Sequence, residues 1–226
     1  MPLENELSLT GLASADGTVR NCLNDAKRQG LRDRLFMQGL ERYLRHGRTL
    51  EIGAATGQLS AILQQHGYDV VASDVAPKFL PAIGARGLKG LVVDATGDIV
   101  AQTGETYANI LAQAVIPLIR RDHDRAMTAL RAIHSALEPG GRLLCIGPYA
   151  WRQPDPRAFY SPKEQMRIAR ASGLFEPVVA YPHQVVPPGW YVPWNMRFLN
   201  FLDHKLAWIA RVRWVWVMEK RSGRSM

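Results

Sequence analysis

Hydrophobic residues between positions 48 and 147 follow two alternating patterns. Short apolar runs, typical of buried strands, alternate with stretches whose apolar residues are three and four apart, as in amphipathic helices. The runs that predict strands are 48–52, Asp69–Asp74, Gly90–Asp94, Tyr107–Ala112 and Arg142–Gly147. The stretches that predict helices are Gln58–Gln65, Pro77–Ala85, a short segment up to Gln102 and a helix capped by Asp122. This alternation indicates an α/β fold, with a parallel sheet and helices on both faces.

The pattern is less regular on either side of this region. Before it we expect a loose lead-in and one or two amphipathic helices within 21–44, so that 1–47 forms an N-terminal helical cap on a domain spanning 48–226. After it we expect a surface loop at 151–160, a helix capped by Ser161, a strand at 176–181, a turn at 182–193, an aromatic helix at 194–210 and a strand at 213–219. Residues 182–211 are thus an insertion between the last two strands.

The first predicted strand ends in a loop of small residues, Gly53-Ala-Ala-Thr-Gly57, which leads directly into a helix. Small side chains let a ligand approach the backbone closely. A loop between a strand and a helix N-terminus also points backbone N–H groups at whatever lies above the sheet edge. The segment therefore predicts a nucleotide-type pocket.

Four features together resemble the class I S-adenosylmethionine-dependent methyltransferases. They are the stretch from Glu51 to Gly57, the two aspartates Asp74 and Asp94, and the turn Leu137-Glu-Pro-Gly-Gly-Arg142. The resemblance covers 48–147 and, more weakly, 214–220. Ala55 replaces the middle glycine of the family's loop, a mild departure. The resemblance implies a Rossmann-like, doubly wound sheet of about seven strands in the order 3-2-1-4-5-7-6, with helices on both faces.

The resemblance implies S-adenosylmethionine as cofactor and assigns roles around it. Asp74 lies 21 positions after Gly53 (74 minus 53), close to the spacing at which an acidic residue accepts the ribose hydroxyls. Asp94 and the Ala95 N–H would recognise the adenine edge, while Glu51 and the Gly53 backbone would face the methionine end. The whole implied set is Glu51, Gly53, Ala54, Ala55, Gly57, Asp74, Val75, Asp94, Ala95 and Gln113.

Three alternatives compete with these assignments. Asp74 could be a turn cap before Pro77, and Asp94 could form an Asx-turn into Thr96 and Gly97. A nicotinamide dehydrogenase also uses a glycine loop and an acidic residue, but its G-x-G-x-x-G fingerprint needs a third glycine. Here the loop glycines stand only at 53 and 57, so the dehydrogenase is disfavoured.

The methyl acceptor is less well defined by the sequence. The stretch 112–116, Ala-Gln-Ala-Val-Ile, lacks the Asn/Asp-Pro-Pro-aromatic motif of enzymes that methylate base amines, and Cys145 lies in mid-strand, typical of a buried hydrophobe. We therefore expect a small, hydrophobic acceptor, such as a lipid, quinone or secondary metabolite. The candidate general bases are His183 and Tyr149, followed by Tyr160 and His204.

Two further features allow two interpretations each. The run from Asp122 to Asp124 could hold a metal, but its position at a helix start favours capping, so no metal is expected. Aromatic residues gather in the insertion, at Trp190, Tyr191, Trp194, Phe198, Phe201 and Trp208. They either pack on the sheet or form a lid over the acceptor, which could touch a membrane surface through Lys205, Arg211 and Arg213.

Composition narrows the possible compartment and partners of the protein but indicates no mechanism. The chain has 226 residues, two cysteines and a net charge of +8. The cysteines form no metal or disulfide pattern, and the acidic start lacks the order of a signal peptide, so we expect a cytoplasmic protein. The positive charge is spread along the chain, which makes nucleic acid an unlikely partner. It leaves a second hypothesis, a methyltransferase-fold protein that binds RNA or a protein partner without small-molecule activity.

Overall fold

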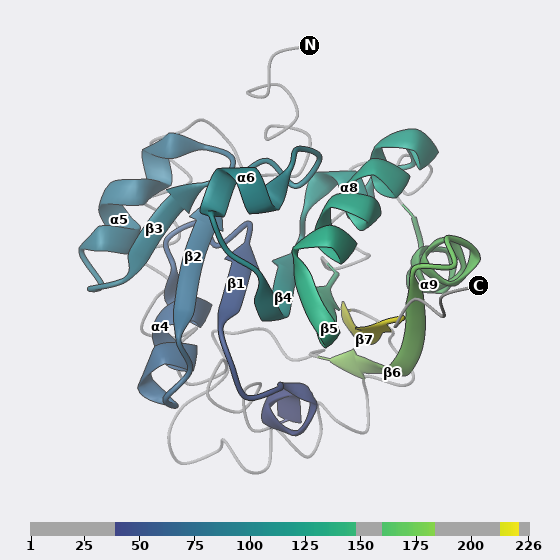
Figure 1. Cartoon of the computed structure of the whole chain (residues 1–226), viewed down its shortest axis with the longest axis horizontal. Coiled ribbons are helices and arrows are strands. Elements are labelled where there is room, and N and C mark those ends of the chain that lie inside the picture. Colours follow the sequence, from purple (N-terminus) through teal and green to yellow (C-terminus); the bar gives the residue numbers. More distant parts are fainter. Residues whose placement is uncertain (1–38, 148–159, 184–212, 222–226) are drawn as a thin grey trace.

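The computed structural model describes residues 39–147, 160–183 and 213–221, and within them a seven-stranded sheet forms the centre of the molecule (Figure 1). The strands are β1 (Thr49–Ile52), β2 (Val70–Asp74), β3 (Lys89–Val92), β4 (Tyr107–Gln113), β5 (Leu137–Ile146), β6 (Phe175–His183) and β7 (Arg213–Lys220). Their order is β3-β2-β1-β4-β5-β7-β6; β7 is antiparallel to both β5 and β6, and the other neighbouring pairs are parallel. This confirms the predicted fold class and strand order.

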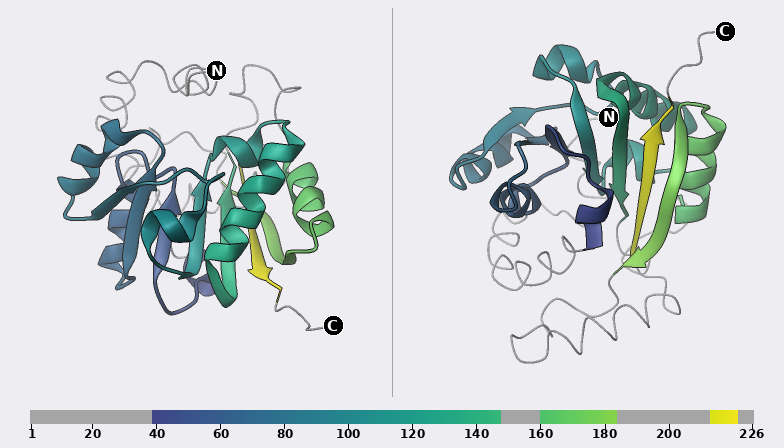
Figure 2. Two further views of the ribbon diagram at one scale, coloured as in Figure 1. Left: turned by 45° about the horizontal axis from the view of Figure 1, so that its top comes forward. Right: turned by 60° about the horizontal axis from the view of Figure 1, so that its bottom comes forward.

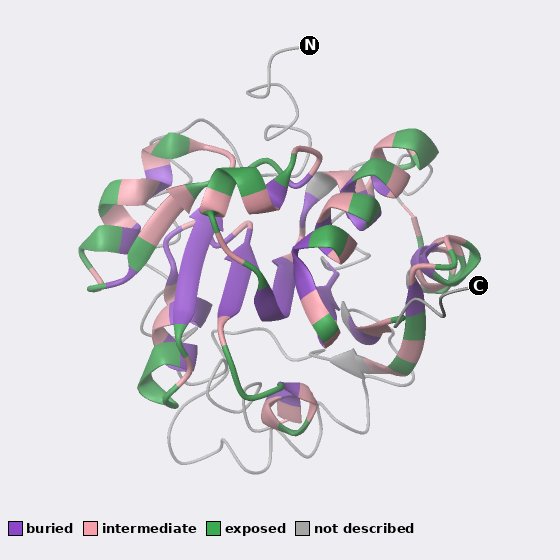
Figure 3. Ribbon diagram, viewed as in Figure 1, coloured by how far each residue is buried: buried purple, intermediate pink, exposed green. Residues whose placement is uncertain are grey.

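Helices cover both faces of the sheet (Figure 2). They are η1 (Glu41–Tyr43), α4 (Gln58–Gln65), η2 (Pro77–Phe79), α5 (Leu80–Gly84), α6 (Ile99–Thr103), α7 (Ile116–Ile119), α8 (His123–Ala136) and α9 (Pro162–Ala171). One apolar cluster joins alternate strand residues to α6, α7, α8 and α9. Two further clusters join the other strand residues to η1, α4 and α5. Because both faces are covered, the central strands β1 and β2 are buried throughout (Figure 3).

The local start signals behave as the sequence predicts. Asp122 caps α8 by accepting a hydrogen bond from the Arg125 N–H at 3.0 Å, so its role is that of a helix cap. Ser161 and Glu164 form a complete capping box at α9. The described residues contain no group of side chains that could hold a metal ion, and no described helix is long and apolar enough to cross a membrane.

Several boundaries differ from the prediction by one or two residues, and two differences follow from the pairing of strands. Residues 138–141, predicted to be a turn, belong to β5, which begins at Leu137 because that residue pairs with Tyr107 of β4. The prediction that Pro182 and His183 lie in a turn is wrong, because they are the last residues of β6 and pair with β7. The predicted N-terminal helices before residue 39, the loop at 151–159 with Tyr149 before it, and the aromatic helix with His204 lie outside the described residues.

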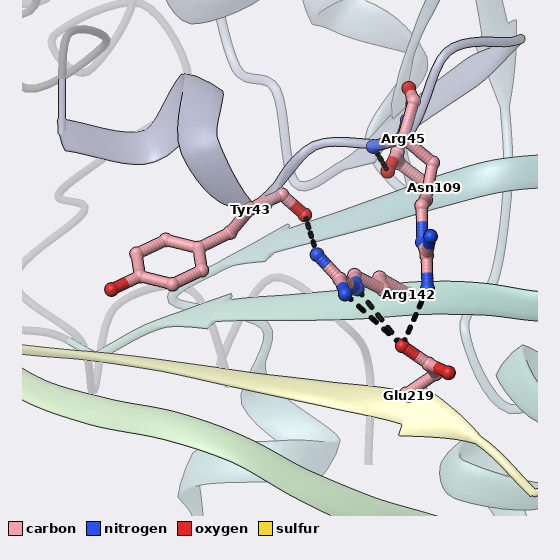
Figure 4. Close-up of polar contacts among 5 residues, drawn as sticks. All are labelled: Tyr43, Arg45, Asn109, Arg142 and Glu219. Carbon is pink, nitrogen blue, oxygen red and sulfur yellow. Dashed lines mark hydrogen bonds and ion pairs between the residues drawn. The ribbon is translucent and has the colours of Figure 1, made fainter.

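A polar network ties the amino end of the sheet to the segment that precedes β1 (Figure 4). Arg142 of β5 donates to Glu219 of β7 through Nε and Nη2, both at 3.1 Å, and to the Tyr43 carbonyl at 3.0 Å. Arg45 donates to the same Glu219 oxygen at 2.8 Å. The buried Asn109 side chain accepts from the Arg45 N–H at 2.8 Å and donates to the Arg45 carbonyl at 2.9 Å. Residues 43–45 are therefore fixed against three strands.

Candidate cofactor site at the carboxyl edge of the sheet

The loop between β1 and α4 is a tight bend pressed against the end of β4. The Ala54 N–H donates to the Ser73 carbonyl of β2, and the Gly57 N–H donates to the Ala54 carbonyl, both at 2.8 Å. Gly53 has a φ of +76°, and a Cβ placed on it would lie 2.9 Å from the Gln113 carbonyl oxygen. Only glycine fits this position without displacing backbone. The conformation of the bend therefore depends both on its own turn and on its contact with β4.

Ala55 has a left-handed backbone, with a φ of +49°. The family pattern has a glycine here, and the positive φ gives the physical reason, since an L-residue with a Cβ pays about 1 kcal/mol to adopt it. The alanine packs against the apolar cluster that joins the loop to α5. In this conformation its N–H donates to the Asp74 Oδ2 at 3.0 Å.

Asp74 ends β2, and its carboxylate lies against the loop, as the strand–loop pattern predicts. Its Oδ1 accepts from the Ala76 N–H at 2.9 Å, and the residue is 6% exposed. Burial raises the pKa of Asp74, although the hydrogen bonds from Ala76 and Ala55 oppose that effect. A carboxylate and a small-residue bend thus meet at one edge of the sheet, with Val75 between Asp74 and the next turn.

Asp94 and Ala95 follow β3 at the same edge. Asp94 is exposed, and its Oδ1 accepts from the Thr96 N–H at 2.8 Å and from the Thr96 Oγ1 at 2.7 Å. This is the Asx-turn that the sequence offered as an alternative, and it occupies one carboxylate oxygen. Ala95 is 5% exposed. The Asx-turn and a ligand-binding role are compatible, because the turn orients a carboxylate whose Oδ2 is outside it.

Glu51 is the third residue of β1, and Gln113 is the last residue of the neighbouring strand β4. The Glu51 side chain is 1% exposed and accepts a short hydrogen bond from the Ser60 Oγ of α4. It therefore lies on the α4 face of the sheet, within the protein, rather than at an open surface. Gln113 is half-buried, and its carbonyl oxygen is the atom that approaches Gly53.

A small apolar cavity lies at the carboxyl ends of β4 and β5 and beside the amino-terminal half of the antiparallel β7, under α7 and α9. Its lining residues are Ala112, Val115, Leu118, Ile119, Cys145, Ile146, Gly147, Gln165 and Trp216. A Cβ placed on Gly53 would lie 3.3 Å from the Val115 side chain, so the cavity adjoins the glycine loop. The buried Gln165 accepts from the Trp216 Nε1 at 3.1 Å. Burial raises the pKa of Cys145, which keeps its thiol neutral.

The sequence did not single out this cavity or Gln165, because the residues that line the cavity come from four separate segments.

Of the candidate bases, His183 ends β6 at the same carboxyl edge, but β4, β5 and β7 lie between β6 and β1. At the usual spacing between strands, this separates the two by about 19 Å. Tyr160 sits before α9, with its ring 5.7 Å from the Arg121 guanidinium carbon, and burial is the main cause of its raised pKa.

Comparison with known proteins agrees with this geometry. Residues 50–145, which hold the glycine loop, both aspartates and the end of β5, match a model of the methyltransferase domain. This part of the chain is therefore similar to a methyltransferase domain, in agreement with the resemblance in the sequence. The matched range extends from the second residue of β1 nearly to the end of β5, so it includes the predicted cofactor edge of the sheet.

Among curated proteins, the chain is 32% identical over 111 residues to the ubiquinone biosynthesis O-methyltransferase of Ruegeria pomeroyi. That match covers 47% of this chain and 43% of the relative, so the chain matches less than half of the relative's length. Among solved structures, a TehB-like S-adenosylmethionine-dependent methyltransferase from Corynebacterium glutamicum has a TM-score of 0.62 at 19% identity, covering 92% of this chain and 98% of that one. Magnesium protoporphyrin IX methyltransferase from Synechocystis, solved with bound S-adenosylmethionine, has a TM-score of 0.56 at 13% identity, covering 90% and 84%.

Proposed function

We propose that the protein binds S-adenosylmethionine at the glycine loop and transfers its methyl group to a small hydrophobic acceptor. The observation that carries the proposal is the contact between the Asp74 carboxylate and the Ala55 N–H at 3.0 Å. It joins the acidic end of β2 to the bend after β1, and an apolar cavity adjoins this bend. A polar cradle for a nucleoside beside apolar side chains suits a charged donor and an apolar acceptor.

The described residues fit the donor in three parts. Asp74 and Val75 would hold the ribose, since a carboxylate at this place accepts hydroxyl hydrogen bonds. Asp94 and Ala95 would recognise the adenine edge. The loop and its neighbours would hold the methionine part, namely Glu51, Gly53, Ala54, Ala55, Gly57 and Gln113. The absence of a Cβ at Gly53 lets the loop backbone approach the Gln113 carbonyl of β4 closely.

The acceptor side is supported by the apolar side chains at this end of the sheet, which surround a cavity of about water size. Apart from Gln165, every lining residue is apolar or small, and the neutral Cys145 thiol carries no charge into it. The Ruegeria pomeroyi relative is named for ubiquinone biosynthesis, and the Synechocystis structure is a protoporphyrin methyltransferase. Both names fit a hydrophobic acceptor for this chain. We propose a lipid, quinone or similar metabolite.

The bound donor supplies an electrophilic methyl group on a sulfonium. The protein then has to orient the acceptor's nucleophilic atom in line with that methyl and exclude water. Where the acceptor atom carries a proton, a base must take it as the new bond to carbon forms and the bond to sulfur breaks. His183 and Tyr149 are the proposed bases: His183 ends β6 at the carboxyl edge of the sheet, and Tyr149 comes two positions after Gly147 in the sequence.

Thermal unfolding with S-adenosylhomocysteine tests the donor half of the proposal. We expect saturating ligand at about a hundred times its Kd to stabilise the wild-type protein by about 2.7 kcal/mol. Asp74→Ala should abolish the shift in melting temperature. Asp69→Ala is the matched control, since Asp69 precedes the same strand at its amino end and pairs with Arg48 at 2.7 Å. A wild-type melting temperature that ignores the ligand would contradict the proposal.

Methyl transfer to a cell extract tests the acceptor half. With S-adenosylmethionine labelled in its methyl group, we expect label in the lipid-soluble fraction and none with Asp74→Ala. Label confined to the RNA or protein fraction would overturn the proposal of a small hydrophobic acceptor while leaving the donor site standing.

A further inference from the structure

The side chain of Gln102, on α6, binds the backbone of the turn that follows β3. Its Oε1 accepts from the Asp94 N–H at 2.7 Å, and its Nε2 donates to the Asp94 carbonyl at 3.1 Å and to the Asp98 carbonyl at 3.2 Å. The amide thus pairs with both backbone groups of Asp94, as a neighbouring strand would. Neither the glycine loop nor the aspartate spacing in the sequence indicated this contact.

The segment from Asp94 to Gln102 accommodates the Gln102 side-chain amide through Gly97 and Asp98. A Cβ on Gly97 would lie 2.7 Å from the Gln102 Nε2, so a side chain there would push the amide away. Asp98 caps α6 by accepting from the Ala101 N–H at 3.0 Å, which sets the first turn of the helix. The Gln102 N–H in turn donates to the Asp98 carbonyl at 3.0 Å. The turn and the short helix therefore form one closed unit.

This pairing determines which groups of the turn point outward. Gln102 forms hydrogen bonds with the Asp94 N–H and carbonyl, and Thr96 donates hydrogen bonds to the Asp94 Oδ1. Within the part of the chain that the structure describes, the Asp94 Oδ2 and the Ala95 N–H make no hydrogen bond. These two groups are an acceptor and a donor on adjacent residues. The adenine edge presents the complement, a 6-amino donor beside a ring-nitrogen acceptor.

We propose that Gln102 is a positioning residue for adenine recognition: its side-chain amide holds the turn so that Asp94 and Ala95 can read the adenine edge. This inference rests on the proposed function, because it assumes that the adenine of the methyl donor lies at this turn. Gln102 would not touch the ligand. Its effect should therefore fall on ligand discrimination at the 6-position rather than on the rest of the site.

The experiment measures binding of two ligands by calorimetry, S-adenosylhomocysteine and S-inosylhomocysteine. The second carries a 6-oxo group, which cannot donate to Asp94, so we expect the wild-type protein to bind it more weakly. Loss of the hydrogen bonds in Gln102→Ala should weaken binding of the adenosyl ligand about tenfold and binding of the inosyl ligand less than about twofold. Gly97→Ala, which displaces the Gln102 amide without removing it, should also weaken binding of the adenosyl ligand more than binding of the inosyl ligand.

Gln65→Ala is the matched control, since Gln65 is an exposed helical glutamine at the end of α4, and it should bind both ligands as the wild type does. A second readout needs no ligand: the Asp94 amide should exchange its hydrogen faster in Gln102→Ala, because its acceptor is gone. Equal weakening of both ligands, or no weakening of either, would overturn the proposal for Gln102 alone. A wild-type protein that binds neither ligand would instead overturn the proposed function.

Discussion

Polar side chains find different kinds of hydrogen-bond partner at the two ends of the sheet. At the amino end, Glu219 accepts from both Arg45 and Arg142, and the Asn109 amide is used on its oxygen and its nitrogen. At the carboxyl end, the buried Asp74 carboxylate accepts hydrogen bonds from the backbone N–H groups of Ala55 and Ala76, and burial raises its pKa. The Ala55 backbone beside it is left-handed. The left-handed Ala55 thus places backbone strain beside the proposed ligand position.

This contrast implies that stability and binding can be altered separately. The amino end joins β4, β5, β7 and the segment before β1, so its contacts hold the sheet together. At the carboxyl end, the Ala54 and Ala55 N–H groups join the loop to β2, and we expect these bonds to contribute less to that cohesion. Substitutions at the two ends should therefore give different signatures, one in unfolding and the other in ligand affinity.

The largest stability effect is expected from Arg142→Ala. The substitution leaves the half-buried Glu219 with Arg45 alone and removes the donor to the Tyr43 carbonyl, so we expect a loss of about 2 kcal/mol in the free energy of unfolding. Urea denaturation measures it. The affinity of the folded fraction for S-adenosylhomocysteine should stay as in the wild type.

Arg221→Ala gives the comparison for this prediction. Arg221 also pairs with a glutamate of a neighbouring strand, Glu176, but at 3.3 Å between exposed side chains, so its loss should cost less than about 1 kcal/mol. If Arg142→Ala cost no more than Arg221→Ala, or if it weakened ligand binding, the division between the two ends would be wrong.

A smaller effect is expected from pH, through Asp74. Since its pKa is raised above 3.8, the folded protein holds this proton more tightly than the unfolded chain does. The carboxyl therefore contributes stability to the ligand-free protein below pH 3.8, and that contribution is lost as the pH rises through the raised pKa. Ribose hydroxyls need the charged form, so affinity for S-adenosylhomocysteine should rise over the same interval.

Calorimetry between about pH 4 and 7 would measure this rise, and we expect it to begin above the range of an ordinary aspartate. Asp74→Asn is the control, because any pH dependence that remains in it belongs to the ligand or to other groups. An affinity that is flat in the wild type across this range would argue against ribose binding by the charged carboxylate.

The smallest effect is expected from Ala55→Gly, which restores the family's loop glycine. Relief of the left-handed backbone should exceed the extra entropy of glycine in the unfolded chain, for a net gain of about 0.5 kcal/mol in unfolding free energy. Ala54→Gly is the matched control one position earlier; Ala54 is buried and has no positive φ, so it should lose stability. If Ala55→Gly destabilised the protein as much as Ala54→Gly does, the backbone of Ala55 would not be strained.

Much of the fold follows from local sequence signals. Alternating apolar runs located the strands, and the caps at Asp122 and Ser161 located the starts of α8 and α9, because such signals involve neighbours in the chain. The errors arose where pairing between distant strands overrides local preference. Pro182 and His183 have the composition of a turn, but β7 pairs with them and extends β6. Leu137 joins β5 in the same way, through Tyr107.

The sequence by itself determined that a small-residue bend follows the first strand, that an aspartate ends the second, and that a parallel sheet brings them to one edge. The tertiary structure alone decided the left-handed backbone of Ala55, the burial of Glu51 against Ser60, the Gln165–Trp216 contact and the amide of Gln102 on the Asp94 backbone. The physical reason is that apolar periodicity records which face of an element is buried. It does not record which polar atoms meet once the elements have packed.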